Sequence, residues 1–164
     1  MAHGRRGSTT LRRRDIGRAE AARAEGGRPR LLLVDEHAVA AHGLRLALKG
    51  CGYDVETTSG PTCADVVEVA ERFRPDIVLT DIDFRNRIAS GIDLIVPLTA
   101  RGSAVVMLTS ERRRLALAEC LEAGAVGWIR KDTDLGGLED ALERVLDGRP
   151  IVGATDRADL RAHQ

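Results

Sequence analysis

Five side chains that could carry out phosphate and metal chemistry stand at the ends of apolar segments. They are Asp35, Glu36, Asp81, Thr109 and Lys131. Clustered carboxylates repel one another, and a hard divalent cation such as Mg²⁺, which takes oxygen ligands, removes that conflict. Lys131 and Thr109 could then bind phosphoryl oxygens, while Asp81 could act as the nucleophile that forms an aspartyl phosphate. The set predicts phosphoryl transfer, with the backbone carbonyl of Asp83 as a further metal ligand.

Four apolar segments are expected to deliver these side chains. Residues 30–34, 75–81 and 104–108 lack the alternation of a half-buried strand, so each is predicted to be a strand buried on both faces, and a further strand is predicted at 125–130. A fifth, weaker strand is predicted at 53–58. Each of these four strands ends at or just before a polar residue of the set: Asp35-Glu36, Asp81, Thr109 and Lys131. The polar residues therefore stand at the carboxyl ends of the strands.

Helical spacing of apolar residues fills the gaps between the strands. A first helix is predicted over 37–50 with Gly50 as its stop, and a second begins at Thr62, a cap with Asp65 three residues later. A short third helix, over 92–98, contains or is broken by Pro97. Further helices are expected over 111–123, capped by Ser110, and from Thr133 or Asp134 to a stop at Gly148.

The alternation of strands and helices predicts an α/β fold. Strands that feed helices at this rate form a parallel sheet with helices on both faces, and right-handed connections leave few arrangements. We expect a doubly wound five-stranded parallel sheet in the order 2-1-3-4-5, a flavodoxin-like fold. Ligands bind such sheets at the carboxyl ends of the strands, beside the point where the strand order reverses, and the five polar side chains converge there.

Composition limits the remaining possibilities. The 164 residues are 43% hydrophobic but only 2% aromatic, enough for one aliphatic core. No apolar run is long enough to span a membrane, no secretory signal is recognisable, and three scattered cysteines predict neither a disulfide framework nor a zinc site, so a cytoplasmic location is expected. Residues 1–30 carry a net charge of +6 and the rest −6. We therefore divide the chain into a basic extension (1–29), one domain (30–150) and a tail or the start of a linker (151–164).

Four motifs together resemble the receiver domain of bacterial two-component response regulators. They are Leu33-Val34-Asp35-Glu36-His37, Pro75-Asp76-Ile77-Val78-Leu79-Thr80-Asp81, Val105-Val106-Met107-Leu108-Thr109-Ser110 and the segment from Glu122 to Asp132. The resemblance covers residues 30–150. Val34-Asp35-Glu36-His37 with Gly43-Leu44, and Lys131-Asp132, look like the subfamily whose output is a helix-turn-helix DNA-binding domain, which lies outside this chain.

The resemblance implies a role for each site residue. Asp81 would accept a phosphoryl group from a sensor histidine kinase, and Asp35 and Glu36 would hold Mg²⁺ directly or through water. Thr109 would be the switch hydroxyl, Lys131 the phosphate-contacting lysine and Trp128 the switch aromatic. Phosphorylation would then repack the fourth helix (111–123), the fifth strand (125–130) and the fifth helix. That surface would form a homodimer and control a DNA-binding output in transcription regulation.

Other interpretations of the same residues remain open. Asp81-x-Asp83 with a later Thr and Lys also resembles the haloacid-dehalogenase phosphatases, although that family places its metal-binding acids after the lysine. A receiver fold used only for interaction, without phosphorylation, is a second alternative, because Phe84-Arg85 replaces the family's usual Met-Pro in a longer loop. His37 is expected to be an exposed residue at a helix start.

Overall fold

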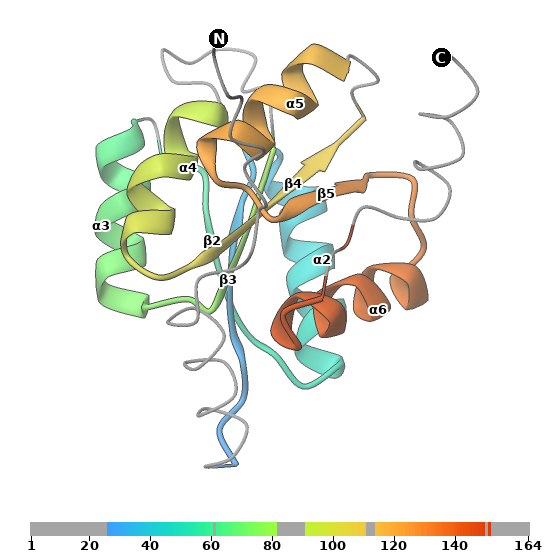
Figure 1. Ribbon diagram of the computed structural model, residues 1–164. Coiled ribbons are helices and arrows are strands. Elements are labelled where there is room, and N and C mark those ends of the chain that lie inside the picture. Colours follow the sequence, from blue (N-terminus) through green and yellow to red (C-terminus); the bar gives the residue numbers. More distant parts are fainter. Residues whose placement is uncertain (1–25, 61, 82–90, 111–113, 150, 152–164) are drawn as a thin grey trace, which may run out of the picture.

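The predicted strands form one parallel sheet in the order β2-β1-β3-β4-β5 (Figure 1), which confirms the predicted topology. The computed structural model describes residues 26–60, 62–81, 91–110, 114–149 and 151. Their elements are β1 (Arg30–Val34), α2 (Ala38–Gly50), β2 (Asp54–Thr58), α3 (Cys63–Phe73), β3 (Ile77–Asp81), α4 (Gly91–Ala100), β4 (Ala104–Thr109), α5 (Arg114–Ala123), β5 (Gly127–Arg130) and α6 (Leu135–Leu146).

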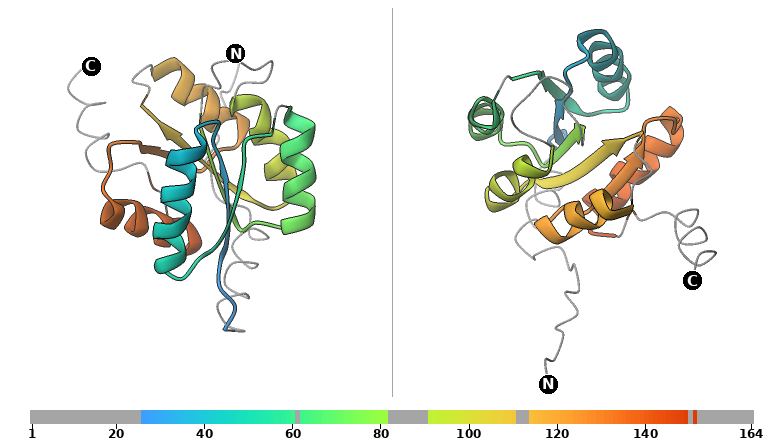
Figure 2. Two further views of the ribbon diagram at one scale, coloured as in Figure 1. Left: turned by 180° about the vertical axis from the view of Figure 1, so that it is seen from behind. Right: turned by 90° about the horizontal axis from the view of Figure 1, so that it is seen from above.

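Helices cover both faces of the sheet (Figure 1 and Figure 2). On one face, α2 and α6 pack against the sheet through apolar residues such as Leu48 and Leu142. On the other, α3, α4 and α5 do so through residues such as Val66, Leu94 and Leu117. Strand residues alternate between the two clusters, and all five residues of β3 are buried. Burial on both faces explains why the central strands show continuous apolar runs.

The strand register brings the predicted site residues to one edge. Val34 pairs with Thr80, so Asp35 follows β1 at the level of Asp81. Asp81 in turn pairs with Leu108, one position before Thr109. Thr109 pairs with Arg130, one position before Lys131. Asp35, Asp81, Thr109 and Lys131 therefore all lie at the same edge of the sheet, because each follows or ends its strand at a similar height.

Several predicted helix boundaries shift by a few residues. The first helix ends at Gly50, as predicted, but Gly50 is its last helical residue. The left-handed residue that follows is Gly52 (φ 98°), so the prediction of Gly50 in the C′ position was wrong. Pro97 lies within α4, which runs from Gly91 to Ala100, so of the two predicted options the helix that contains the proline is the one found. The prediction that Ser110 caps a helix from 111 involves residues 111–113, which lie outside the described part of the chain.

The chain after α6 returns to the core. Gly148 adopts a left-handed conformation (φ 71°), as expected of a helix stop, and the N–H of Arg149 donates to the carbonyl of Arg144. Ile151 is then 6% exposed and belongs to the core cluster on the α2–α6 face. The final described residue is thus anchored beside α6.

Neither a disulfide nor a membrane-spanning helix is present in the described residues. Cys51, Cys63 and Cys120 are present as free thiols there. Burial, helped by the charge of Asp93, raises the pKa of the Cys63 thiol, which keeps it protonated at neutral pH. Among the described helices, none combines the length and apolar character needed to cross a bilayer.

A capping box begins α3, as the sequence predicts, and yields a stability prediction. The hydroxyl of Thr62 accepts from the N–H of Asp65 at 3.2 Å, and the Asp65 carboxylate accepts from the N–H of Thr62 at 3.1 Å. We expect Thr62→Ala to lower the free energy of unfolding by about 1 kcal/mol, because a donor of the first helical turn loses its partner. Urea denaturation measures this loss. Glu68→Ala on the exposed side of the same helix is the control, and an equal loss in both variants would contradict the assignment.

Candidate functional site

Asp81, the last residue of β3, forms an ion pair with Lys131, the first residue after β5. The Nζ atom of Lys131 lies 2.5 Å from Oδ2 of Asp81. The backbone N–H of Lys131 also donates to the carbonyl oxygen of Thr109 at 2.9 Å, so the end of β4 fixes where the lysine side chain starts. The Asp81 side chain is 10% exposed and that of Lys131 is 32% exposed. Partial shelter from water strengthens the attraction between the two charges and holds the ammonium beside the carboxylate.

Asp35 and His37 occupy the neighbouring turn between β1 and α2. The N–H of Asp35 donates to the carbonyl of Thr58 at 3.1 Å, which ties this turn to the end of β2. Oδ1 of Asp35 accepts a hydrogen bond from the backbone N–H of His37 at 2.9 Å. The same oxygen lies 3.1 Å from Nδ1 of the His37 ring. Asp35 is 9% exposed, so its carboxylate is held in a defined position under the start of α2.

The donor set at this edge suits a divalent cation. One ligand atom from each of Asp35, His37 and Asp81 lies within 4.8 Å of the others. Two ligands on opposite sides of one ion are about 4 Å apart, so small side-chain movements would allow all three to bind it. Glu36, which was predicted to share the metal with Asp35, is half-buried and is not a member of this trio. Asp83, predicted as a carbonyl ligand, lies outside the described residues.

Thr109 and Trp128 take different positions relative to this site. Thr109 is 1% exposed at the end of β4, beside the residue that pairs with Asp81. Trp128 pairs with Met107 within the sheet, three positions before Lys131. It is partly buried and packs against the core cluster on the α3–α4–α5 face. Thr109 therefore belongs to the site edge, whereas Trp128 lies in the packed layer behind it.

The structure thus brings Asp35, Asp81 and Lys131 together, with Thr109 on the adjoining strand end. It also adds His37, which sequence reasoning placed near the site only as an exposed helix-start residue. Its ring is 55% exposed, yet it lies at Asp35. The spacing Asp35-x-His37 across a strand-to-helix turn is the signal that could have found this contact, because an Asp side chain readily accepts from the N–H two residues later.

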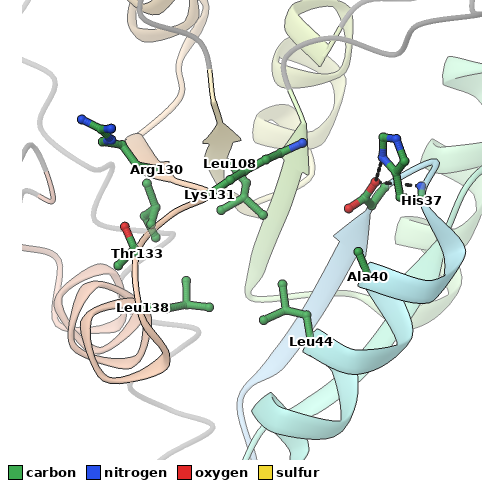
Figure 3. A pocket seen from close by; sticks show the side chains of 10 residues that line it. His37, Ala40, Leu44, Leu108, Arg130, Lys131, Thr133 and Leu138 are labelled. Atoms are coloured by element: carbon green, nitrogen blue, oxygen red, sulfur yellow. Dashed lines mark hydrogen bonds and ion pairs between the residues drawn. The ribbon is translucent and has the colours of Figure 1, made fainter.

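A pocket of about 220 Å³ continues from the site into the layer between α2 and α6. Its apolar lining comes from both helices and from the strands beneath them, with Leu44, Leu108 and Leu138 among its residues. Figure 3 shows Lys131 extending across the mouth of this pocket toward the α2 side, where His37 lies. The polar end of the pocket is therefore the candidate site itself.

Comparison with known proteins gives one family match. A family model described as the response regulator receiver domain matches residues 31–143. The transcription regulator BvgA of Bordetella pertussis is 26% identical over 136 residues, covering 80% of this chain and 63% of that protein. A protein-glutamate methylesterase/protein-glutamine glutaminase of Anaeromyxobacter dehalogenans is 32% identical over 140 residues, covering 82% of this chain and 38% of that protein.

Solved structures agree on the fold. A two-component response regulator of the LuxR family from Aurantimonas sp. SI85-9A1 superposes with a TM-score of 0.70 at 24% identity, covering 84% of this chain and 100% of that chain. The matched part of this chain spans about three fifths (63%) of the length of BvgA.

Proposed function

The chain belongs to the response regulator receiver domain family, and we propose that it is a phosphorylation-dependent signalling switch whose phosphoryl acceptor is Asp81. The ion pair between Asp81 and Lys131, at the edge that also holds Asp35, is the observation that carries this proposal. An acceptor carboxylate beside a fixed ammonium is suited to phosphoryl transfer, which depends mainly on positioning and on charge stabilisation.

The transfer follows from these positions. A sensor histidine kinase presents a phosphohistidine to the edge of the sheet. A carboxylate oxygen of Asp81 forms a bond to phosphorus while the bond between phosphorus and the imidazole nitrogen breaks, and that nitrogen keeps the electron pair. Lys131, already at the Asp81 carboxylate, neutralises charge on the transferred group. The hydroxyl of Thr109, at the end of the neighbouring strand, donates a hydrogen bond to a phosphoryl oxygen.

The cation proposed for this site is Mg²⁺. Asp35, Glu36 and Asp81, with the backbone carbonyl of Asp83, would hold it. Bound there, it would neutralise the phosphoryl oxygens and relieve the repulsion between the carboxylates. Without a cation, phosphorylation would add further negative charge next to Asp35, which is a reason to expect transfer to depend on the ion.

The output of the switch is proposed to be a change at α5, β5 and α6. Contact of Thr109 and Lys131 with the phosphoryl group would bias the packing of these elements, with Trp128 in β5 reporting the change. We propose that this surface forms a homodimer and that a DNA-binding domain beyond this chain controls transcription. BvgA, described as a transcription regulator, is consistent with such an output. The receiver itself would have no catalytic output, and it would work in the cytoplasm beside its kinase.

Beryllofluoride, an inert stand-in for a phosphoryl group, tests the proposal. We expect it to bind only when Mg²⁺ is present, because the carboxylates and the anion need the cation between them. Binding should change the fluorescence of Trp128, the one tryptophan of the chain. The titration is run on the wild type and on Asp81→Asn, in which binding should be lost.

The alternatives give different outcomes in the same assays. A fluorescence trace that stays flat with and without Mg²⁺, together with no phosphoryl uptake, would favour a receiver fold used only for interaction. Multiple turnover on small phosphate esters would favour a phosphatase.

A further inference from the structure

His37 occupies the N-cap position of α2, but its side chain does not cap the helix. It is the N-cap residue of α2, and its side chain makes no capping hydrogen bond. Ser, Thr, Asp and Asn are preferred at such positions because their oxygens accept from the first N–H groups of the helix. The imidazole instead reaches back to the Asp35 carboxylate. Capping therefore does not explain where this ring lies.

The ring forms a donor set with the two buried acids. Its nitrogen and a carboxylate oxygen from each of Asp35 and Asp81 lie within 4.8 Å of one another. The two acids are 9% and 8% exposed, whereas the His37 side chain is 55% exposed. The set therefore has two buried carboxylates, of which Asp81 also holds the Lys131 ammonium, and one nitrogen at the entrance, where an ion arriving from solvent would meet it.

The chemistry of this set differs from that of an all-oxygen site. Mg²⁺ prefers oxygen ligands in near-octahedral geometry and retains several waters. Imidazole favours borderline ions such as Zn²⁺, Co²⁺ and Ni²⁺, and the affinity of a mixed nitrogen and oxygen site rises along the first transition series. Zn²⁺ binds both imidazole nitrogen and carboxylate oxygen, and its sites with an open position have three protein ligands, the number that this set offers.

We infer that His37 is a direct metal ligand and that the Asp35–His37–Asp81 trio binds a borderline divalent transition metal such as Zn²⁺ or Co²⁺ more tightly than Mg²⁺. This inference rests on the proposed function, because it concerns the cation site beside the same acceptor. The transition metal and Mg²⁺ compete for Asp35 and Asp81, so the ratio of the two ions sets which one accompanies phosphoryl transfer.

The ring nitrogen gives a direct spectroscopic test. In the full chain with ¹⁵N-labelled histidine, Zn²⁺ is expected to shift one imidazole nitrogen of His37, whereas Mg²⁺ is not. His42 is the matched control, because it is exposed on α2 five positions after His37 and the trio does not include it. Zn²⁺ shifts at His42 with none at His37 would overturn the inference.

Affinity provides the second readout. Co²⁺ and Mg²⁺ are titrated separately into the wild type, His37→Ser and His42→Ser, with Co²⁺ followed by its visible absorption. Serine keeps an N-cap residue at position 37, so the variant should fold. His37→Ser should weaken Co²⁺ binding by roughly tenfold or more, at least the loss seen when an outer-shell partner is removed, and leave Mg²⁺ binding within about twofold. An equal change for both ions, or no change, would overturn the inference.

The two proposals fail separately. If His37→Ser leaves Co²⁺ binding intact while the wild type still takes up a phosphoryl group with Mg²⁺, only the inference about His37 is wrong. If the transition metal binds through His37 and Asp81 still accepts no phosphoryl group, the proposed signalling function is wrong and the metal site remains.

Discussion

Asp81→Asn is expected to abolish phosphoryl uptake by the chain. The asparagine amide keeps the shape of the side chain, but its oxygen carries no negative charge and is a poor nucleophile toward phosphorus. With acetyl phosphate and Mg²⁺, the wild type should gain the mass of one phosphoryl group, and the variant should gain none. Intact-mass spectrometry under native and then denaturing conditions measures the gain.

The control for this prediction is Asp76→Asn near the other end of the same strand. Asp76 is 9% exposed and Asp81 is 8% exposed, so the two acids are similarly buried. Asp76 accepts a hydrogen bond from the N–H of Arg30 at 2.9 Å, and an amide oxygen can still accept it. This variant should be phosphorylated like the wild type. An equal mass gain in Asp81→Asn and the wild type would remove Asp81 from the mechanism.

Lys131→Ala is expected to separate phosphorylation from its consequence. Its ammonium is the group that the structure places on the Asp81 carboxylate, 2.5 Å from Oδ2. Without it, Asp81 should still be phosphorylated with Mg²⁺, at a rate lower by roughly tenfold to a hundredfold, because one charge-stabilising group is lost. The larger effect concerns the switch, since the direct contact between the phosphoryl group and the start of the β5–α6 turn is then lost.

The measurement compares two signals from one sample. Mass spectrometry gives the phosphorylated fraction, and the fluorescence of Trp128 gives the response of β5. In Lys131→Ala the first signal should persist and the second should vanish. Lys49→Ala at the end of α2, the other lysine of the chain, should preserve both. A normal tryptophan response in phosphorylated Lys131→Ala would count against a switching role for Lys131.

Much of the fold could be predicted because the burial of the central strands is visible in the sequence as continuous runs of apolar residues. A strand covered on both faces needs apolar residues throughout, and β3 is buried at all five positions. Once strands and helices alternate, a parallel sheet and right-handed connections leave few orders, and the observed order was among them. The position of the candidate site could then be predicted as well, because residues that follow parallel strands meet at one edge of the sheet.

The orientation of individual side chains could not be predicted in the same way. His37 was expected to be exposed, and its ring is 55% exposed, but the sequence alone did not show that the ring reaches Asp35. A rotamer choice of this kind depends on the turn formed between β1 and α2. Similarly, the sequence offered both Gly50 and Gly52 after the apolar positions of α2, and only the structure shows that Gly52 is the left-handed one.

Helix α4 illustrates a tertiary effect that local propensity misses. The sequence left open whether the third helix contains Pro97 or is broken by it, because proline lacks the N–H that a helix interior needs. The helix nevertheless continues to Ala100. Residues on either side of the proline, Ile95 and Leu98, are fully buried, and the guanidinium of Arg101 donates to the carbonyl of Pro97 at 2.9 Å. Burial of these residues favours the helical arrangement. The carbonyl of Asp93, to which a proline at position 97 cannot donate, accepts instead from the Cys63 thiol at 3.7 Å.

The burial of Ile151 extends the folded domain beyond the end of α6. Its side chain belongs to the core cluster that also contains residues of α2 and α6, so it is an apolar anchor for the chain at this position. Replacing the isoleucine with a small polar residue would remove that anchor, and the backbone amide at position 151 should then exchange its hydrogen with solvent faster.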